Sequence, residues 1–419
     1  MRICLLYCTS LLLYFLLIST NVHSQLQKIY LHPKAPGSEK QSQVVDSIRF
    51  IPLEIKEGVD VSGFNTVTVT ANYFLIINYS ASTILVYHKN GAFVNKISYK
   101  KLGQRFYPAY DEKTNHLVFF GANQNYSLTS KDQIQIMLDW NNPRNKKYFR
   151  KYAIDLADPE FSIQKSSPNE NDILRANHCY DDYYWSGQIT TSDLFKDSMD
   201  YELKIYKDNA LVKAFFPYNR ITEPKYIFTR ASVSLNSTNN PDIHLVTRPF
   251  CDTIYRMVKN SMAPAYHLVL PMENSLPASF HTQPFKNKTE RENFERNNGW
   301  MFRQVYSIYE TPRLIFLSVG YLSNHETYLY QKQTNTTYKA KNIRTDSSQY
   351  NLALLADKDI ERYGLERKGD RFYKTQKAGD LLAFFEKNKS VAVPKELETF
   401  LNSKPNSNAP VIVEFKLKN

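Results

Sequence analysis

The 419-residue sequence lacks the motifs that most directly mark catalysis or metal binding. It contains no Gly-x-Ser-x-Gly nucleophile elbow, no His-Glu-x-x-His zinc helix, no glycine-rich phosphate loop and no aspartate-rich calcium loop. Glycosidases are not excluded in this way, because their paired carboxylates have no fixed spacing in the sequence and are recognised by their distance in space. We therefore name no catalytic residue and no metal ligand, and we expect no cofactor.

Long hydrophobic runs are almost absent, and the one that exists lies at the start of the chain. Arg2 precedes the apolar segment 5–18, and small residues before Gln25 provide a cleavage site after Ser24. The run is too short and too early for a membrane span. We expect residues 1–24 to be a signal peptide, and residues 25–419 to form one extracytoplasmic domain, periplasmic or secreted, with no transmembrane segment.

Cysteine is rare, with four in the whole chain. Cys4 and Cys8 fall in the signal peptide, which leaves Cys179 and Cys251 as a possible pair in an oxidising compartment. A bridge between them would close a loop of about 73 residues and contribute roughly 4 kcal/mol in the chain-entropy model. Two separate buried cysteines fit the sequence equally well, so a disulfide is one of two alternatives.

Acidic residues are outnumbered by basic ones, and the formal charge of +12 falls to +11 when the signal is removed with Arg2. A basic balance can indicate a nucleic acid or an anionic surface as partner. Export argues against nucleic acid, and the charge is scattered along the chain. We interpret the densest basic run as a solvated outer strand or loop. It comprises Arg144, Lys146, Lys147, Arg150 and Lys151, interrupted by Tyr148 and Phe149.

The most informative stretch, residues 65–97, has the pattern of four short antiparallel strands. Its first strand alternates threonine and valine, so one face is polar and one apolar. The second strand, 73–77, is apolar on both faces and must be covered by neighbouring sheets. Asn90-Gly91 between the last two strands favours a two-residue type I′ turn, whose central positions both need a positive φ.

A four-stranded meander of about thirty residues is the unit of a β-propeller blade. The hairpin with its Lys-Asn-Gly turn recurs in the sequence without a gap at 253–261, with one residue deleted at 206–212, and more loosely at 328–332. The spacing of these repeats alone allows five to seven blades. We place blade two from 107, blade three over 177–216, blade four over 226–270 and blade five from Trp300, with short helices at 285–298 and 394–401.

The two ends of the chain each carry an isolated apolar strand, at 44–53 and 410–416. A circular fold must join its first and last blades, and pairing both ends in one sheet removes two exposed edges. We predict that these strands lie in the same closing blade.

These residues resemble the six-bladed β-propeller family of exported bacterial proteins, over most of the mature chain. The similarity rests on Ile51-Pro52-Leu53-Glu54, the 85–97 hairpin, Asp252-Thr253-Ile254-Tyr255-Arg256 and the strand at 410–418. The chain departs from the family pattern in its long 121–150 insertion and in its poor glycine turn after Ile97. The resemblance implies an all-β, six-bladed propeller of four-stranded antiparallel blades with short helical insertions. It implies no catalytic residues.

Aromatic side chains and arginines provide the candidate binding residues. Tyrosine and phenylalanine are abundant, 30 and 25 residues, and tyrosine combines a flat apolar face with a polar tip that suits sugar or peptide binding. Most of these rings are expected to pack between blades. The candidates for the channel face are Tyr183, Tyr184, Trp185, Arg230, Arg248 and Trp300.

Two functions fit these features. The first is a non-enzymatic binding or scaffold propeller that presents its channel face to a glycan, a peptide or a partner protein, and we expect it to be a monomer. The alternative is an extracellular carbohydrate-active hydrolase or lyase with acids at the channel mouth. Two or three carboxylates converging within about 5–10 Å would favour the enzyme. Isolated arginines with aromatic and threonine side chains would favour binding.

Overall fold

The computed structural model places most of the mature chain. It describes residues 26–34, 37–61, 66–79, 81–102, 108–123, 125–127, 129–131, 136, 143–168, 176–189, 198–221, 232–282, 285–355 and 366–418. The expected signal peptide and the candidate residue Arg230 lie outside these ranges.

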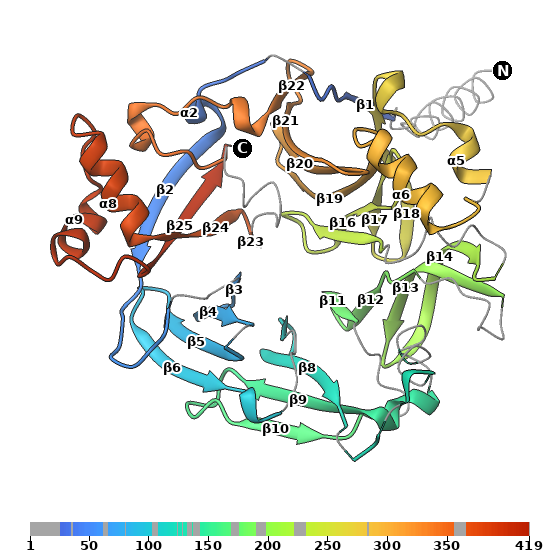
Figure 1. Ribbon diagram of the computed structural model, residues 1–419, viewed down its shortest axis with the longest axis horizontal. Coiled ribbons are helices and arrows are strands. Elements are labelled where there is room, and N and C mark those ends of the chain that lie inside the picture. The colour runs from blue at the N-terminus through green and yellow to red at the C-terminus, as the bar shows by residue number, and fades with distance from the viewer. Residues whose placement is uncertain are drawn as a thin grey trace, which may run out of the picture.

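Six sheets, each with four antiparallel strands, stand in a ring (Figure 1), which confirms the six-bladed propeller. We number the blades in chain order. Blade 1 contains β3 (Thr66–Val69), β4 (Tyr73–Asn78), β5 (Thr83–His88) and β6 (Phe93–Ser98). Blade 2 contains β7 (Ala109–Asp111), β8 (His116–Ala122), β9 (Phe149–Asp155) and β10 (Ile163–Ser166). Blade 3 contains β11 (Asn177–Tyr180), β12 (Tyr183–Ser186), β13 (Met199–Lys207) and β14 (Ala210–Asn219).

The second half of the ring follows the same plan. Blade 4 contains β15 (Ser234–Ser237), β16 (Ile243–Thr247), β17 (Thr253–Val258) and β18 (Ser261–Val269). Blade 5 contains β19 (Phe302–Glu310), β20 (Leu314–Tyr321), β21 (His325–Gln331) and β22 (Thr336–Lys339). Blade 6 contains β23 (Glu366–Lys368), β24 (Arg371–Lys377), β25 (Pro410–Leu417) and β2 (Val45–Pro52).

The ring closes through the two ends of the chain, as predicted. β2 pairs antiparallel with β25 from Val45 opposite Leu417 to Pro52 opposite Val411. An additional strand, β1 (Gln27–Tyr30), was not predicted and lies parallel to β18 at the outer edge of blade 4. Both β2 and β1 supply backbone hydrogen-bond partners to a strand edge that would otherwise be open to other chains.

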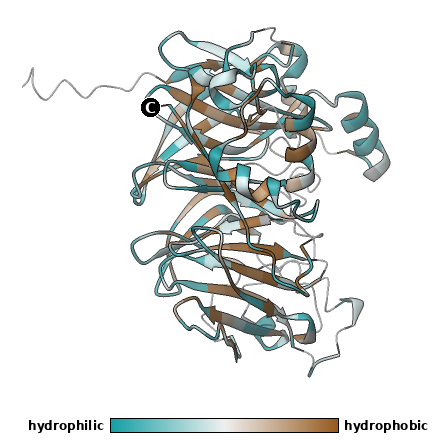
Figure 2. Ribbon diagram, turned by 90° about the vertical axis from the view of Figure 1, so that its left-hand side faces the viewer, coloured by the Kyte–Doolittle hydropathy of each residue, from teal (hydrophilic) through white to brown (hydrophobic). Residues whose placement is uncertain are grey.

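Apolar second strands account for the stacking of the blades. β4 is buried along almost its whole length, and β20 along all of it. Leu75 and Ile77 on one face of β4 pack with residues of blade 2, and Phe74 and Ile76 on the other face pack with residues of blade 6. The prediction that this strand is covered on both sides is therefore confirmed. Figure 2 shows the hydrophobic colour running along the strands, between hydrophilic turns.

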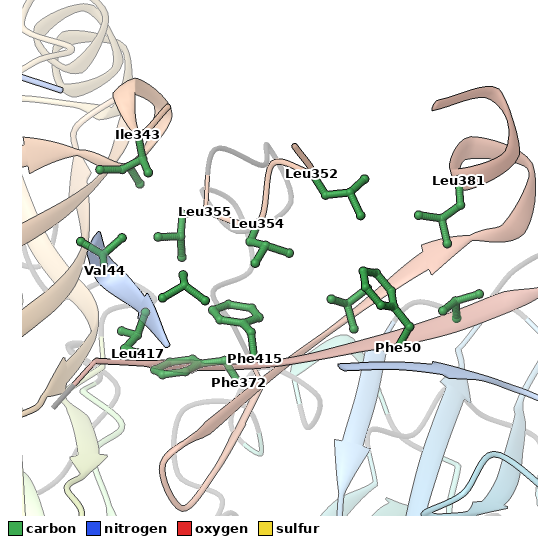
Figure 3. Packing of buried hydrophobic residues seen from close by; sticks show 14 of the residues in the cluster. Val44, Phe50, Ile343, Leu352, Leu354, Leu355, Phe372, Leu381, Phe415 and Leu417 are labelled. Carbon is green, nitrogen blue, oxygen red and sulfur yellow. The ribbon is translucent and has the colours of Figure 1, made fainter. Parts of the chain in front are cut away.

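The largest core cluster joins blades 5 and 6 to a helical cover (Figure 3). At its centre Phe372 of β24 stacks on Phe415 of β25, with ring centroids 5.5 Å apart. Leu381 of helix α8 packs into the same cluster. The cluster therefore continues the strand core of the closing blade out to its helices.

The repeated hairpins occupy equivalent places, because each joins the third and fourth strands of its blade. The turn type predicted at Asn90-Gly91 is wrong. Gly91 N donates to His88 O and His88 N donates to Ala92 O, both at 2.9 Å, which closes a three-residue loop. Only Gly91 (φ +90°) is left-handed there, so Asn90 keeps an ordinary backbone. The two-residue turn with both φ values positive occurs instead at Asp208-Asn209.

Helices fill connections between strands. The predicted helices are present as α6 (Lys288–Asn297) and α9 (Lys395–Asn402), whereas α8 (Ala378–Lys387) was not predicted. The shorter ones are α2 (Gln41–Val44), α5 (Ala278–Thr282), η1 (Lys100–Leu102), η2 (Pro143–Tyr148), η3 (Met272–Asn274), η4 (Ala340–Asn342) and η5 (Ser347–Gln349). Within the described ranges, no helix has the length and apolar character needed to cross a membrane.

Candidate functional site

The first strand of each blade lies nearest the centre of the ring and borders the channel (Figure 1). These strands are β3, β7, β11, β15, β19 and β23. They run in the same direction, so the turns that follow them meet at one end of the channel. We call this end the turn rim, and it comprises residues 70–72, 112–115, 181–182, 238–242, 311–313 and 369–370. The opposite end is the loop rim.

Three consecutive charged residues of β23 reach from blade 6 to other blades. Glu366 Oε1 accepts a hydrogen bond from the backbone N–H of Val69 in blade 1 at 3.4 Å. Arg367 Nη2 donates to the carbonyl oxygen of Ser237 in blade 4. Lys368 Nζ pairs with the carboxylate of Glu112 in blade 2. We call Glu366, Arg367 and Lys368 the channel charges, because together they tie blade 6 to three other blades of the ring.

Two tyrosine rings support the channel charges. The Arg367 guanidinium lies 4.7 Å from the ring centroid of Tyr309 on β19, and the Lys368 ammonium lies 5.8 Å from that of Tyr110 on β7. Tyr309 is fixed in turn by a hydrogen bond from its hydroxyl to Asn239 Oδ1 at 3.1 Å. A cation over an aromatic face gains about 0.5–1 kcal/mol at an exposed site and more when it is desolvated. The two cations are therefore held in place before any ligand arrives.

Glu366 is the carboxyl group of this cluster with the most altered acidity. Burial raises its pKa from 4.5 to about 7, and this effect exceeds the opposing ones of the Val69 N–H, Lys368 and Arg367. A large share of the Glu366 side chains is therefore protonated at neutral pH. A protonated carboxyl can donate a hydrogen bond or a proton, which an ordinary glutamate cannot do at this pH.

Several carboxylates at or next to the turn rim on blades 2 and 3 have partners. Asp111 accepts from the Tyr184 hydroxyl at 3.2 Å and from Thr114 Oγ1 at 2.8 Å. Asp182 pairs with Lys113, across the contact between the two blades. The hydroxyl of Tyr184 is a poor acid here, because burial and the Asp111 charge raise its pKa to about 12. Asp111 and Asp182 are thus already engaged.

The predicted aromatic residues of blade 3 divide between the rim and the core. Tyr184 takes part in the turn rim through Asp111, as described above. Tyr183 stacks on Tyr180, with ring centroids 4.7 Å apart, and the Lys207 ammonium lies 5.3 Å from its ring. Trp185 packs against the hydrophobic cluster of blades 3 and 4. Trp185 therefore fills space between blades.

The remaining candidates lie at the loop rim, away from the channel charges. Arg248 makes a two-point pair with Glu202, with Nε–Oε2 and Nη2–Oε1 distances of 2.7 and 2.6 Å. The Glu202 side chain is only 3% exposed, so this is a largely buried ion pair between blades 4 and 3. Trp300 precedes β19, is 42% exposed and lies 5.3 Å from the Tyr321 ring. The predicted residues that the structure describes therefore do not form one site.

The possible Cys179–Cys251 disulfide is not formed, because both residues are free thiols in the structure. Cys179 donates to the Tyr183 carbonyl at 3.2 Å within its own hairpin. Cys251 is 3.8 Å from the carbonyl oxygen of Thr253, next to its own loop. Burial raises the pKa of Cys179 to about 12, so its thiol is not reactive. The alternative of two separate cysteines describes the structure.

The segment 177–185 forms a hairpin with its turn at Asp181-Asp182. In the part of the chain that the structure describes, no group of three or more His, Cys, Asp or Glu side chains could hold a metal ion.

The channel charges were missed at the level of the sequence. The segment Glu366-Arg367-Lys368-Gly369-Asp370-Arg371 carries a Gly-Asp dipeptide between charged residues, and Gly369 adopts φ +62° in the two-residue turn. A glycine in such a pair is a hairpin signal. It could have located β23, but it gives no indication that the strand borders the channel.

Comparison with known proteins supports the architecture. A solved structure of a protein from Bacteroides fragilis NCTC 9343, named as an exported protein, is 16% identical with a TM-score of 0.52, and the match covers 94% of this chain and 100% of that one. A DUF4221 family member from Bacteroides vulgatus is 11% identical, with coverage of 91% and 100% and a TM-score of 0.41. An oligogalacturonate lyase with manganese is 10% identical, with coverage of 85% and 78% and a TM-score of 0.37. At 16% identity, the Bacteroides fragilis match shows a shared fold alone.

Sequence comparison gives the family. No curated protein matches the chain. The model of a domain of unknown function, DUF4934, matches residues 29–416, which is nearly the whole length that follows the expected signal peptide. The chain therefore belongs to the DUF4934 family, and it folds as a six-bladed β-propeller.

Proposed function

We propose that the protein is an exported binding or scaffold propeller that presents its turn rim to a polar ligand, with a glycan as the first candidate and a peptide or a partner protein as the others. The observation that carries the proposal is the set of channel charges, which connect blade 6 to blades 1, 2 and 4. Groups held in this way lose little conformational freedom when a ligand binds, which favours affinity. The apolar leader at residues 1–24 supports export.

The state of the acids favours binding over catalysis. A hydrolase of glycosidic bonds needs two carboxyl groups that face the scissile bond, one of which acts as an acid and the other as a base or a nucleophile. At the turn rim Glu112, Asp111 and Asp182 are each engaged by a lysine or by hydroxyl groups. The tyrosines beside them offer flat faces and polar tips, which suit a sugar ring.

One observation supports the alternative, a carbohydrate-active hydrolase or lyase. Glu366 has a pKa of about 7, which is the range of a general acid that works at neutral pH. Arg367 and Lys368 next to it could bind an acidic substrate group. In this alternative Glu366 protonates the leaving oxygen, and Glu366→Gln abolishes turnover while it preserves binding.

A glycan array probed with residues 25–419 tests the proposal, followed by product analysis of each glycan that binds. We expect binding without product, and a loss of at least tenfold in affinity for the Arg367→Met and Lys368→Met variants. Lys395→Met removes one positive charge from the exposed start of α9 and is the matched control. Product formed at a catalytic rate would replace the binding function with the enzymatic alternative. Unchanged affinity in both channel variants would remove the turn rim as the site.

A further inference from the structure

The long insertion of blade 2 forms a cleft at the end of β8 and the start of β9. Its volume is about 540 Å³, within the range of roughly 300–1,000 Å³ that is usual for small-molecule sites. The lining residues are Asn123, Asn125, Tyr126, Lys146, Lys147, Phe149, Arg150, Ser167 and Pro168. None of the channel charges contributes to it, so this cleft is independent of the turn rim.

The cleft is lined by the densest basic run of the sequence. The interpretation of that run as a solvated segment is wrong for Lys146, which is only 3% exposed. The helix η2 carries Lys146 and Lys147, and β9 carries Arg150, so the run turns back on itself and brings three cations to one cleft. Arg144 remains exposed, as the sequence interpretation expects.

Hydrogen bonds fix the wall of the cleft. The backbone N–H of Asn123 donates to the Tyr148 carbonyl at 2.7 Å, and its side-chain amide donates to the Lys147 carbonyl at 2.9 Å. These two bonds attach η2 to the end of β8. On the opposite side Arg150 donates to the hydroxyl of Ser167, which follows β10. The positions of the basic residues are therefore set by the fold of blade 2.

The charged residues of the described part of the lining are all basic. Among the lining residues that the structure describes, three are cationic and none is an aspartate or a glutamate. The field of a cleft lined by cations attracts anions. We therefore expect a ligand with at least one negative group.

The neutral groups of the lining match a sugar. Tyr126 is 43% exposed, and its ring is held edge-on against Tyr148 with centroids 5.4 Å apart. A ring fixed in this way provides a flat apolar face next to the cations. The side chain of Asn125 has both donors and acceptors, which suit paired hydroxyl groups. A nucleic acid would need positive charge repeated along a strand, beyond a single cleft.

We propose that the blade 2 cleft binds an acidic oligosaccharide, whose carboxylate or sulfate group lies between Lys147 and Arg150 and whose sugar ring stacks on Tyr126. This inference does not rest on the function proposed for the turn rim. The carboxylate and the sulfate are the same ligand chemistry from two kinds of sugar, and binding assays separate them.

Isothermal titration of residues 25–419 tests the proposal with four probes. They are a galacturonic acid trimer, its fully methyl-esterified form, a sulfated disaccharide and inorganic sulfate. We expect the acidic trimer or the sulfated disaccharide to bind, the esterified trimer to bind at least tenfold more weakly, and added salt to weaken binding. Equal affinity for the acidic and the esterified trimer would overturn the proposal, as would binding of inorganic sulfate alone or of no probe.

Single-residue variants test whether the ligand binds in this cleft. We expect Lys147→Met and Arg150→Met each to reduce the affinity for the acidic oligosaccharide about tenfold. Tyr126→Ala should also reduce this affinity, while the melting temperature of the variant stays at the wild-type value. Lys395→Met, the matched loss of one charge elsewhere, should bind as the wild type does. Full affinity in the Lys147 and Arg150 variants would refute the site. Arg367→Met distinguishes the two sites, because it affects only ligands of the turn rim.

Discussion

The raised pKa of the Glu366 carboxyl leads to a quantitative prediction. We expect Glu366→Gln to stabilise the protein at neutral and alkaline pH. Glutamine has the shape of glutamate, and its oxygen can accept the same hydrogen bond from Val69 N–H. It cannot ionise. The variant therefore removes only the cost of holding a negative charge at a half-buried position of β23.

The magnitude follows from the pKa. Burial raises the pKa of Glu366 from 4.5 to about 7, so the folded state binds the proton more tightly than the unfolded chain does. The contribution of the Glu366 carboxyl to the free energy of unfolding is then fully present below about pH 4.5, and it is lost as the pH rises through 7. Each pKa unit corresponds to about 1.4 kcal/mol, which sets an upper limit of roughly 3–4 kcal/mol for this carboxyl. Solvent at the channel and the neighbouring cations reduce the expected gain in Glu366→Gln to about 1–2 kcal/mol at pH 8.

The assay compares guanidinium unfolding of wild type and Glu366→Gln between pH 4.5 and pH 8. Taking the difference between the two proteins cancels the titration of every other group. We expect the two curves to coincide at the acidic end and to separate steadily toward pH 8. Glu396→Gln, on the exposed face of α9, is the control and should show no such separation. Parallel curves for Glu366→Gln and wild type across the whole range would refute our account of the carboxyl.

Two further predictions concern stability. Arg248→Met leaves the buried carboxylate of Glu202 without its two-point partner, so we expect a loss of about 3–5 kcal/mol in the free energy of unfolding; the double variant with Glu202→Gln should recover most of it, and no recovery would contradict the ion-pair explanation. Gly91→Ala places a Cβ 2.1 Å from the Pro52 carbonyl oxygen at φ +90°, whereas Gly58→Ala at φ +76° meets nothing within 4 Å. We expect the melting temperature to fall several degrees further for Gly91→Ala than for Gly58→Ala, and equal effects would show that the close approach to Pro52 is unimportant.

Much of the fold could be predicted because propeller blades have strong local signals. The doubly apolar strand 73–77 required cover on both sides, and the repeated hairpins marked the third and fourth strands of four blades. The pairing of the chain ends followed from the need to remove open edges. The strand β1 could not be predicted in this way, since four residues added parallel to an edge have no turn or partner nearby in the sequence.

The candidate sites were harder to predict, because they depend on which side chains cross between blades. Arg248 follows an apolar strand and Trp300 precedes one, as expected. Both lie at the loop rim, away from the channel charges. The strand β23 is only three residues long, and its reach to three other blades depends on the curvature of the ring. The burial of Lys146 likewise depends on the return of the insertion onto β8. Local sequence patterns indicate neither the reach of β23 to other blades nor the burial of Lys146.

The pairing of β2 with β25 has a consequence for the order of assembly. The partner of β2 is β25, at the far end of the described chain. A chain that ends before Pro410 therefore leaves β2 without a sheet partner and one edge of β24 open, on either side of a gap. The ring can therefore be sealed only after β25 has been made. A C-terminal truncation should behave as an opened circle with two adhesive edges, prone to exchange strands with its neighbours.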